Sequence, residues 1–220
     1  MSAATLHTAL QQRLSALSAG PRRLLGIVGA PGSGKSTLAA LAVGHMGTRA
    51  QAVPMDGYHL AQAELERLGI AKRKGAPHTF DAAGYAALLR RLRQQGDGDD
   101  VVYAPDFRRE IEEPVAGALP IFAQTPLILT EGNYLLLQEG PWTQVAGLLD
   151  EVWYLHVDPA LRLQRLTRRH EQFGRSPTDT VAWIAANDEP NARVIEASRH
   201  RAHRQVVWND GSACFEFLAD

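Results

Sequence analysis

"GIVGAPGSGKST", residues 26–37, places three closely spaced glycines, Gly29, Gly32 and Gly34, between an apolar run and the start of a helical pattern. The pattern G-x-x-x-x-G-K-[ST] is met by Gly29, Gly34, Lys35 and Ser36. "LLGIV" before it predicts a strand and "STLAALAVGHM" after it predicts a helix, which is the strand, loop and helix order that a phosphate-binding loop requires. The alternative is a plain strand-to-helix turn without a ligand.

Glycines in this loop let the backbone turn its N–H groups toward phosphate oxygens, and the helix N-terminus adds partial positive charge. The Lys35 ammonium is expected to reach the β- and γ-phosphates, and the Ser36 hydroxyl to bind Mg²⁺. The predicted nucleotide-binding residues of this phosphate loop are Gly29, Ala30, Pro31, Gly32, Ser33, Gly34, Lys35, Ser36 and Thr37.

The composition is that of a soluble globular protein of 220 residues, 45% of them hydrophobic and 21% charged. The formal net charge of −1 removes the overall electrostatic argument for a nucleic acid or an anionic membrane as partner. Residues 1–20 lack the apolar core of a signal peptide, and the single cysteine, Cys214, cannot form an internal disulfide. We therefore expect a cytoplasmic protein that binds a small-molecule substrate, and the sequence leaves a homodimer open.

Short apolar runs alternate with helical patterns along the chain. Strands are predicted at residues 22–29, 50–55, 100–105, 126–130, 151–157 and 204–208. This alternation predicts an α/β fold in one domain over residues 1–220, with a doubly wound parallel sheet and helices on both faces. Residues 1–20 are expected to hold a helix, and the polar stretch 94–100 a solvated loop. The buried face of that first helix would consist of Leu6, Leu10, Leu14 and Leu17.

Two carboxylates follow predicted strands at their carboxyl ends, where ligands of open α/β sheets bind. Asp56 follows the second strand and is placed to accept the proton of a substrate hydroxyl; the alternative is a helix cap or a turn residue. Glu131 follows the all-apolar run 126–130 and suits Mg²⁺ or its waters; the alternative is a surface acid.

An arginine-rich helix is predicted at the start of a small lid over about residues 159–180. Arg162, Arg165 and Arg169 share one face of it, and Arg175 follows. Guanidinium groups bind phosphate in a bidentate fashion, so Arg165, Arg169 and Arg175 are expected to reach the nucleotide. The alternative is a solvated basic helix face.

Phosphate loops occur in motors, switches and kinases alike, so other segments must decide between these classes. The guanine-binding motif N-K-x-D of GTPase switches does not occur in the sequence. The transporter-ATPase signature L-S-G-G-Q has only an imperfect counterpart at residues 17–20, which precedes the loop. The histidines lack the spacing of a zinc site. A kinase is the class that these observations favour.

Six segments occur in the order found in the phosphoribulokinase and uridine kinase family, which includes the bacterial pantothenate kinases: GAPGSGKST, VPMDGYH, RKGAPHTFD, YAPDFRREIEEP, LTEGNYLLL and RLQRLTRRHEQFGR. The chain resembles that family over nearly its whole length after the first helix. The resemblance implies a P-loop kinase fold, with Asp56 as the catalytic aspartate, Glu131 in the metal site and the arginine-rich segment as a mobile lid.

The segment RKGAPHTFD, residues 73–81, is closer to the pantothenate kinase form than to the uridine kinase form. In uridine kinases an acidic residue that holds the ribose hydroxyls precedes the His-Pro pair, whereas this sequence has Arg73, Lys74 and Gly75 there. Bacterial chains with this pattern also resemble proteins described as fructose-transport kinases. A pantothenate-like compound, a sugar such as fructose and a nucleoside are all candidate acceptors.

These features predict an ATP- and Mg²⁺-dependent kinase that phosphorylates a hydroxyl of a small metabolite. Lys35, Asp56 and Arg169 are the predicted catalytic residues, and Ser36 and Glu131 the predicted metal ligands. The predicted substrate-binding residues are Asp56, Tyr58, His59, Lys74, His78, Arg108, Asn133 and Asn191. The alternative is a P-loop regulatory protein that binds ATP without phosphorylating a metabolite.

Overall fold

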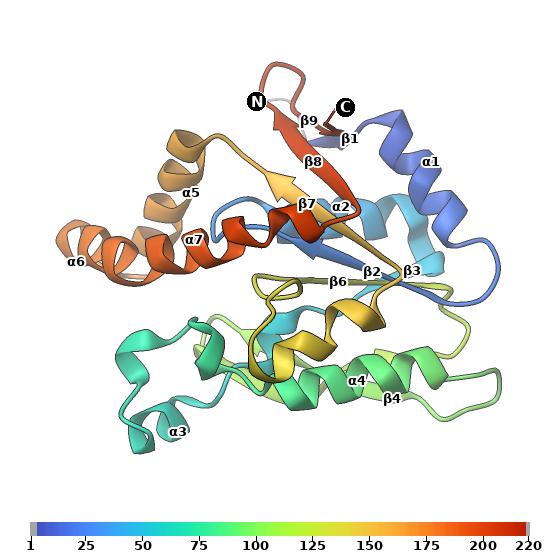
Figure 1. The fold of residues 1–220 in the computed structure, drawn as a ribbon, viewed down its shortest axis with the longest axis horizontal. Coiled ribbons are helices and arrows are strands. Elements are labelled where there is room, and N and C mark those ends of the chain that lie inside the picture. Colours follow the sequence, from blue (N-terminus) through green and yellow to red (C-terminus); the bar gives the residue numbers. More distant parts are fainter. Residues whose placement is uncertain (1–3, 219–220) are drawn as a thin grey trace.

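A seven-stranded β-sheet runs through the middle of the molecule (Figure 1). The computed structural model describes residues 4–218. Neighbouring strands of the sheet are parallel in the described chain, except for β8 and β9. This sheet confirms the predicted doubly wound α/β fold. In spatial order its strands are β1 (Thr5–Leu6), β9 (Cys214–Phe217), β8 (Arg204–Asn209), β7 (Glu151–His156), β2 (Arg23–Val28), β6 (Leu127–Gly132) and β3 (Ala50–Ala52).

Helices cover both faces of the sheet (Figure 1). One face is covered by α1 (Thr8–Leu17) and α2 (Lys35–Met46), and the other by α4 (Ala82–Gln94) and α7 (Glu189–Ala197). The remaining helices lie toward the end of the molecule at which β7 terminates, and they are α3 (Gln62–Arg67), α5 (Pro159–Gln172) and α6 (Pro177–Trp183). That end therefore holds the segment predicted to be a lid.

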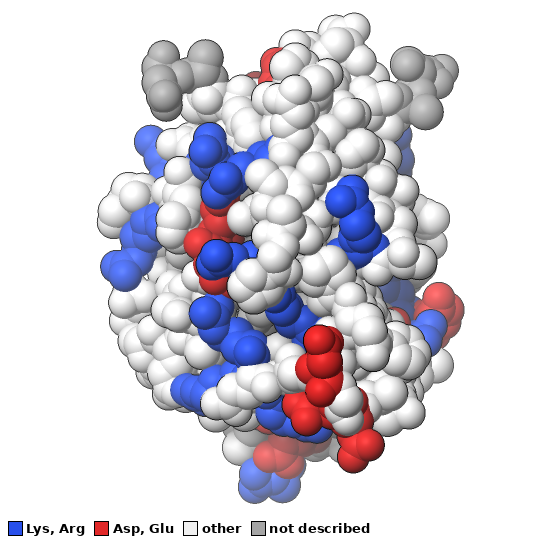
Figure 2. Space-filling model, turned by 90° about the vertical axis from the view of Figure 1, so that its right-hand side faces the viewer, with Lys and Arg blue, Asp and Glu red and all other residues white. Residues whose placement is uncertain are grey.

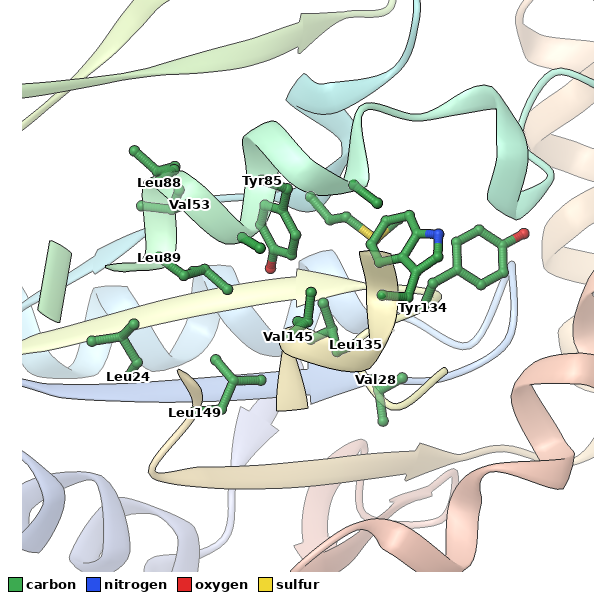
Figure 3. Close-up of a cluster of buried hydrophobic side chains, with 14 of the residues drawn as sticks. Leu24, Val28, Val53, Tyr85, Leu88, Leu89, Tyr134, Leu135, Val145 and Leu149 are labelled. Carbon is green, nitrogen blue, oxygen red and sulfur yellow. The ribbon is translucent and has the colours of Figure 1, made fainter. Parts of the chain in front are cut away.

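The central strands β2, β6 and β7 are apolar along most of their length because both of their faces are buried. In β2, Leu24 and Val28 belong to the core under α4, whereas Leu25 and Ile27 pack with α1 and α2. Figure 3 shows the first of these cores, with Tyr85 of α4 pointing toward the sheet. The alternation of side chains along a strand thus fills two separate cores and fixes the register of the strand between them.

β4 (Val102–Arg108) and β5 (Glu113–Ile121) form a separate two-stranded antiparallel sheet. The prediction that residues 100–105 form a strand of the central sheet is therefore wrong, since this strand pairs with β5. Val102 and Ala104 are buried against the core while Tyr103 is 58% exposed, so the strand is covered on one face only. Pro105 also lacks the N–H that a central strand needs.

The N-terminal helix is shorter than predicted, because α1 spans Thr8–Leu17 and the two residues Thr5–Leu6 form an edge strand beside β9. Residues 1–3 lie outside the described residues. Leu10, Leu14 and Leu17 form the predicted buried face of the helix, whereas Leu6 is buried from β1. The loop predicted at residues 94–100 is confirmed, apart from its first residue, which still belongs to α4.

A π-helical turn, Ile184–Asp188, joins α6 to α7, so that residues 177–197 form one helix with one wide turn. Pro190 accounts for the irregularity, because it has no N–H to donate to the carbonyl of Ala186, four residues earlier. Nη1 of Arg73 donates to that carbonyl instead, at 2.5 Å. A distant loop thereby satisfies a polar group that the helix leaves free.

The end of the molecule away from α5 and α6 carries basic and acidic side chains, several of them next to one another, amid uncharged surface (Figure 2). Arg23 and Arg93 both pair with Asp150, at 2.9 and 3.0 Å. Within residues 4–218, no helix has the length and apolar character needed to cross a membrane.

Candidate active site

The phosphate loop lies between β2 and α2, as predicted. Gly32 and Gly34 have φ angles of 82° and 99°, a left-handed conformation that glycine adopts without strain. α2 begins at Lys35, and none of the described side chains caps its N-terminus. The first N–H groups of α2 therefore have no intrahelical partner, and together with the helix dipole they form an anion-binding site.

The side chain of Lys35 folds back over the loop and is buried. Its Nζ donates to the carbonyl oxygens of Gly29 and Ala30, at 2.8 and 3.2 Å. Burial lowers the pKa of Lys35 to about 8, although the nearby carboxylates of Glu131 and Asp56 act in the opposite direction. The ammonium is thus desolvated, and its hydrogen-bond acceptors are neutral carbonyl groups. The negative charge of a bound phosphate would stabilise the protonated form of Lys35.

Ser36 and Glu131 form a pair of oxygen ligands beside Lys35. Oγ of Ser36 donates to Oε1 of Glu131 at 2.8 Å. Burial raises the pKa of Glu131, and the Asp56 carboxylate adds to this effect. Lys35 already lies near Glu131, and a further positive charge there would offset the free-energy cost of burying the ionised carboxylate. Mg²⁺ prefers oxygen ligands, and it usually combines one or two protein side chains with phosphate oxygens and waters. The hydroxyl of Ser36 and the carboxylate of Glu131 therefore fit a magnesium ion.

Asp56 lies in the short 3₁₀ turn Met55–Tyr58 that follows β3. Gly57 lets this turn approach the hairpin, because a Cβ there would lie 2.4 Å from the carbonyl oxygen of Pro105. Oδ2 of Asp56 lies 3.6 Å from Nη2 of Arg109, and the two side chains are 30% and 40% exposed. The carboxylate is therefore accessible and has a cation beside it.

A cavity of about 470 Å³ lies beside the phosphate loop and joins residues that are far apart in the sequence. The turn after β3, the end of β6, the β4–β5 hairpin, the loop 70–80 and the helices α5 and α7 contribute to its walls. The phosphate end and the acceptor end of the predicted site thus share one space. The predicted residues that line it are Pro31, Lys35, Ser36, Asp56, His59, Lys74, Glu131, Asn133, Arg169, Arg175 and Asn191.

Two arginines in the first half of α5 contact the phosphate loop. Arg162 is buried, pairs with Glu189 and donates to the Pro31 carbonyl at 3.4 Å. Nη1 of Arg165 donates to the Ser33 carbonyl at 3.3 Å. The predicted basic face of α5 therefore packs on the loop rather than facing solvent.

Two further arginines of the predicted lid reach the 470 Å³ cavity. Burial lowers the pKa of Arg169, and the neighbouring Arg109 contributes to this shift. The guanidinium of Arg175 stacks on Trp183, with its Cζ 4.0 Å from the ring centre. Its Nη1 is buried and has no hydrogen-bond partner among the described residues. Both groups stand where an additional anion would be stabilised.

The loop 70–80 is tied to the helix that runs from α6 to α7. Besides the Ala186 carbonyl, Nη1 of Arg73 contacts Oδ1 of Asn187 at 3.1 Å. Nδ2 of Asn191 donates to the carbonyl of Gly75 at 3.2 Å. Arg73 is therefore a link between the loop and this helix, and it does not line the cavity.

The structure does not bring three predicted substrate-binding residues to the cavity. Tyr58 packs on Tyr85, with ring centres 5.4 Å apart, and His78 is exposed in a 3₁₀ turn. Nε of Arg108 lies 3.6 Å from Oδ2 of Asp106, away from the cavity. In the phosphate loop, Thr37 is exposed, while Ala30 and Ser33 line a second cavity of about 820 Å³ between α5 and α7.

Arg109 is the main cavity residue that the sequence interpretation misses. It follows directly after β4, and successive side chains of a strand point to opposite sides. Arg108 and Arg109 therefore point to opposite sides, and Arg109 is the one that reaches the cavity. The register shift between Ala104 and Asp106 breaks the simple alternation, so the sequence pattern does not show which of the two faces the site. His170 and Asp188, which contact each other at 2.8 Å, also line the cavity and were not predicted to do so.

Comparison with known proteins identifies the family. Over 186 residues the sequence is 34% identical to a "putative uridine kinase" of Schizosaccharomyces pombe, and the alignment covers 80% of this chain and 78% of that protein. The chain belongs to the phosphoribulokinase and uridine kinase family. This P-loop kinase matches no family model, so its membership rests on such relatives and on the fold.

Two further similarities support membership in this kinase family. The crystal structure of a "putative fructose transport system kinase" from Silicibacter sp. TM1040 has 36% sequence identity and a TM-score of 0.80, and covers 91% of this chain and 98% of its own. An "ATP-dependent kinase-like protein" of Aspergillus versicolor is 38% identical over 162 residues, which are 70% of this chain and 94% of that protein. The chain is an ATP-dependent P-loop kinase of small molecules.

Proposed function

We propose that this kinase transfers the γ-phosphoryl group of ATP to a hydroxyl of a small metabolite bound in the 470 Å³ cavity. The observation that carries the proposal is that one cavity is lined by the phosphate-loop Lys35, the strand-end Asp56 and the lid residue Arg169. Phosphoryl transfer needs little covalent chemistry from the protein, and these three groups supply what it does need: positioning, a proton acceptor and positive charge.

In this proposal the Asp56 carboxylate accepts the proton of the acceptor hydroxyl. The hydroxyl oxygen forms a bond to the γ-phosphorus, while the bond between that phosphorus and the bridging oxygen of ADP breaks. Lys35 and the N–H groups of the loop bind the phosphates, and Arg169 stabilises the charge of the transferred group. Ser36 and Glu131 would hold Mg²⁺, which neutralises phosphate charge when bound.

Several acceptors remain candidates. The names of the relatives include a uridine kinase and a fructose transport kinase, which support a nucleoside and a sugar respectively. The segment 73–75 has no carboxylate to hold ribose hydroxyls, which favours a sugar or a pantothenate-like compound over a nucleoside. A regulatory protein that binds ATP without phosphorylating a metabolite is the alternative from another class.

Acceptor-dependent release of ADP tests this function. The purified protein would be incubated with ATP, Mg²⁺ and one acceptor at a time: pantothenate, nucleosides, fructose, glycerate and ribose. One class of acceptor is expected to raise the rate of ADP release well above the rate without acceptor. Tight ATP binding with no acceptor-dependent release across the panel would support the regulatory alternative instead.

The lid is expected to close over bound nucleotide. Arg169 and Arg175 carry positive charge that a phosphate would balance, so residues 168–177 should become ordered when ATP and an acceptor are present. Trypsin cleavage in this segment is expected to slow by at least about tenfold with both ligands. Cleavage at the exposed Arg49 is the internal control. Equal cleavage of residues 168–177 with and without ligands would contradict a lid.

ATP affinity is expected to fall as the pH rises above about 8. The pKa of Lys35 lies near 8 in the free protein, so its ammonium loses the proton above that pH and must regain it to bind phosphate. A single linked proton lowers affinity by up to about tenfold per pH unit. Calorimetry at pH 9 in two buffers of different ionisation enthalpy should show uptake of close to one proton. Affinity that stays constant from pH 7 to 9.5 would contradict this assignment.

A further inference from the structure

The second cavity, of about 820 Å³, lies between α5 and α7 and borders the phosphate loop. None of the described residues that line it also lines the 470 Å³ cavity. α7 separates the two: Asn191 lines the active-site cavity, whereas Arg193 and Glu196 line the second one. Residues two or five positions apart point in widely different directions from an α-helix. The second cavity is therefore a space of its own, and its volume is within the range of small-molecule sites.

The second cavity combines apolar wall with a surplus of positive charge. The apolar residues that line it are Ala30, Leu155, Val157, Pro159, Ala192 and Ala197. Its charged lining consists of three arginines and two glutamates. Arg162 pairs with Glu189. Arg199 pairs with Glu196, whereas the exposed Arg193 forms no ion pair within residues 4–218. A ligand that suits this lining is largely apolar and carries one negative charge.

A buried hydroxyl of the phosphate loop borders the second cavity. Ser33 is 1% exposed, and its Oγ has no hydrogen-bond partner among the described residues. A Cβ on Gly29 would lie 2.8 Å from both this Oγ and the carbonyl oxygen of Leu155, so the two polar atoms flank the same gap. A buried polar group without a partner is costly, and a ligand that forms a hydrogen bond to Ser33 would remove that cost.

The elements around the second cavity also hold the phosphate loop in place. Arg162 of α5 donates to the carbonyl of Pro31 in the loop, at 3.4 Å. α5 lies so close to the loop that a Cβ on Gly32 would be 2.7 Å from Cγ of Leu166. A ligand between α5 and α7 would fix α5 against the loop, so less conformational freedom would be left for ATP to remove when it binds. The two ligands should therefore strengthen each other's binding.

We propose that the second cavity is an effector site for an amphipathic monoanion, and that a ligand bound there strengthens ATP binding at the phosphate loop. The apolar body of the ligand packs on the alanine-rich wall, its charge pairs with Arg193, and one of its polar atoms reaches Ser33. This site does not involve the acceptor, so it is independent of which metabolite the kinase phosphorylates.

Two fluorescent probes of matched shape test the site. 8-Anilinonaphthalene-1-sulfonate has an aromatic body with one negative charge, and N-phenyl-1-naphthylamine is the same body without the charge. The sulfonate should bind at least about tenfold more tightly than the neutral probe. Saturating ATP and Mg²⁺ should leave it bound and lower its Kd by about fivefold or more, and it should lower the Kd of ATP by the same factor.

Three outcomes with these probes would overturn the inference. Displacement of the sulfonate by ATP would show that the second cavity is part of the nucleotide site. Equal affinity for the two probes would show that the site does not select an anion. An ATP affinity that the bound sulfonate leaves unchanged would exclude an effector role.

Variants of α7 test where the sulfonate binds. Ala197→Trp, which fills the second cavity from an exposed position, should weaken its binding by at least about tenfold. Arg193→Gln should weaken the sulfonate by about tenfold and leave the neutral probe unchanged. Without probe, both variants should bind ATP as the parent does, so loss of the effector site is distinguishable from loss of the nucleotide site.

Val194→Trp and Arg201→Gln are the matched controls, because both residues are exposed and lie outside the two cavities. They should leave the affinity for both probes unchanged. A Tm close to that of the parent shows that each variant is folded. Sulfonate binding that neither Ala197→Trp nor Arg193→Gln weakens would place the probe elsewhere on the protein and overturn the inference.

Discussion

Asp56→Asn is expected to lower kcat by at least about a hundredfold while ATP affinity and Tm stay close to those of the parent protein. Asparagine keeps the shape of the side chain but cannot take the proton of the acceptor hydroxyl, and general-base assistance is typically worth roughly 10²- to 10⁴-fold in rate. The substitution also removes the pairing with Arg109. Because both side chains are partly exposed, that loss should cost at most about 1 kcal/mol of stability.

The control for this experiment is Asp106→Asn. Asp106 lies on β4, pairs with Arg108 at 3.6 Å and does not line the cavity, so it loses a comparable ion pair without touching the proposed chemistry. Normal turnover of Asp56→Asn would show that the carboxylate is not the base. Activity that falls only in step with Tm would show that Asp56 serves the turn after β3 instead.

Lys35→Ala is expected to leave the fold intact, to weaken ATP binding and to abolish measurable transfer. The ammonium is buried in the phosphate loop, and the substitution removes the two charge-assisted hydrogen bonds that we expect it to donate to the outer phosphates. At about 1.5 to 3 kcal/mol for each bond, kcat/KM should fall by roughly 10²- to 10⁴-fold. Calorimetry with ATP and the ADP-release assay measure the two effects separately.

Lys72→Ala is the matched control for this variant, since Lys72 is exposed and lies outside the cavity. Its affinity for ATP and its turnover should equal those of the parent. If Lys35→Ala binds ATP and turns over as the parent does, the phosphate loop does not hold the nucleotide. A circular dichroism spectrum that matches the parent would show that the loss of binding is not a loss of fold.

The phosphate loop and the two strand-end carboxylates were predictable because the sequence places them locally. Few conformations of a glycine-rich turn can connect a buried strand directly to a helix, so the motif predicts the loop. The carboxyl ends of parallel strands meet at one edge of the sheet, so the residues that follow them are predicted to lie together. Asp56 and Glu131, 75 positions apart in the sequence, therefore come to the same cavity. Their assigned roles remain predictions, which the variants above test.

The acceptor side was less predictable because it depends on which way single side chains point. The hairpin that carries Arg108 and Arg109 lies outside the central sheet, so strand-end reasoning does not apply to it. Tyr58 lies two residues after Asp56 in the same short turn, yet it packs against the hydrophobic core and does not line the cavity. No pattern in the sequence indicates the hydrogen bond from Arg73 to the Ala186 carbonyl, because the two residues are 113 positions apart. This carbonyl is available because Pro190 has no N–H to donate to it.

The π-helical turn before α7 has a consequence for changes of chain length near the cavity. An α-helix turns by about 100° for each residue, so a residue inserted into a regular α-helix rotates everything after it by that angle. The wide turn Ile184–Asp188 holds one residue more than an α turn, and α7 continues from it with Asn191 at the cavity wall. Deleting one residue from this turn should therefore close it to an α turn and leave the cavity-facing side of α7 in place.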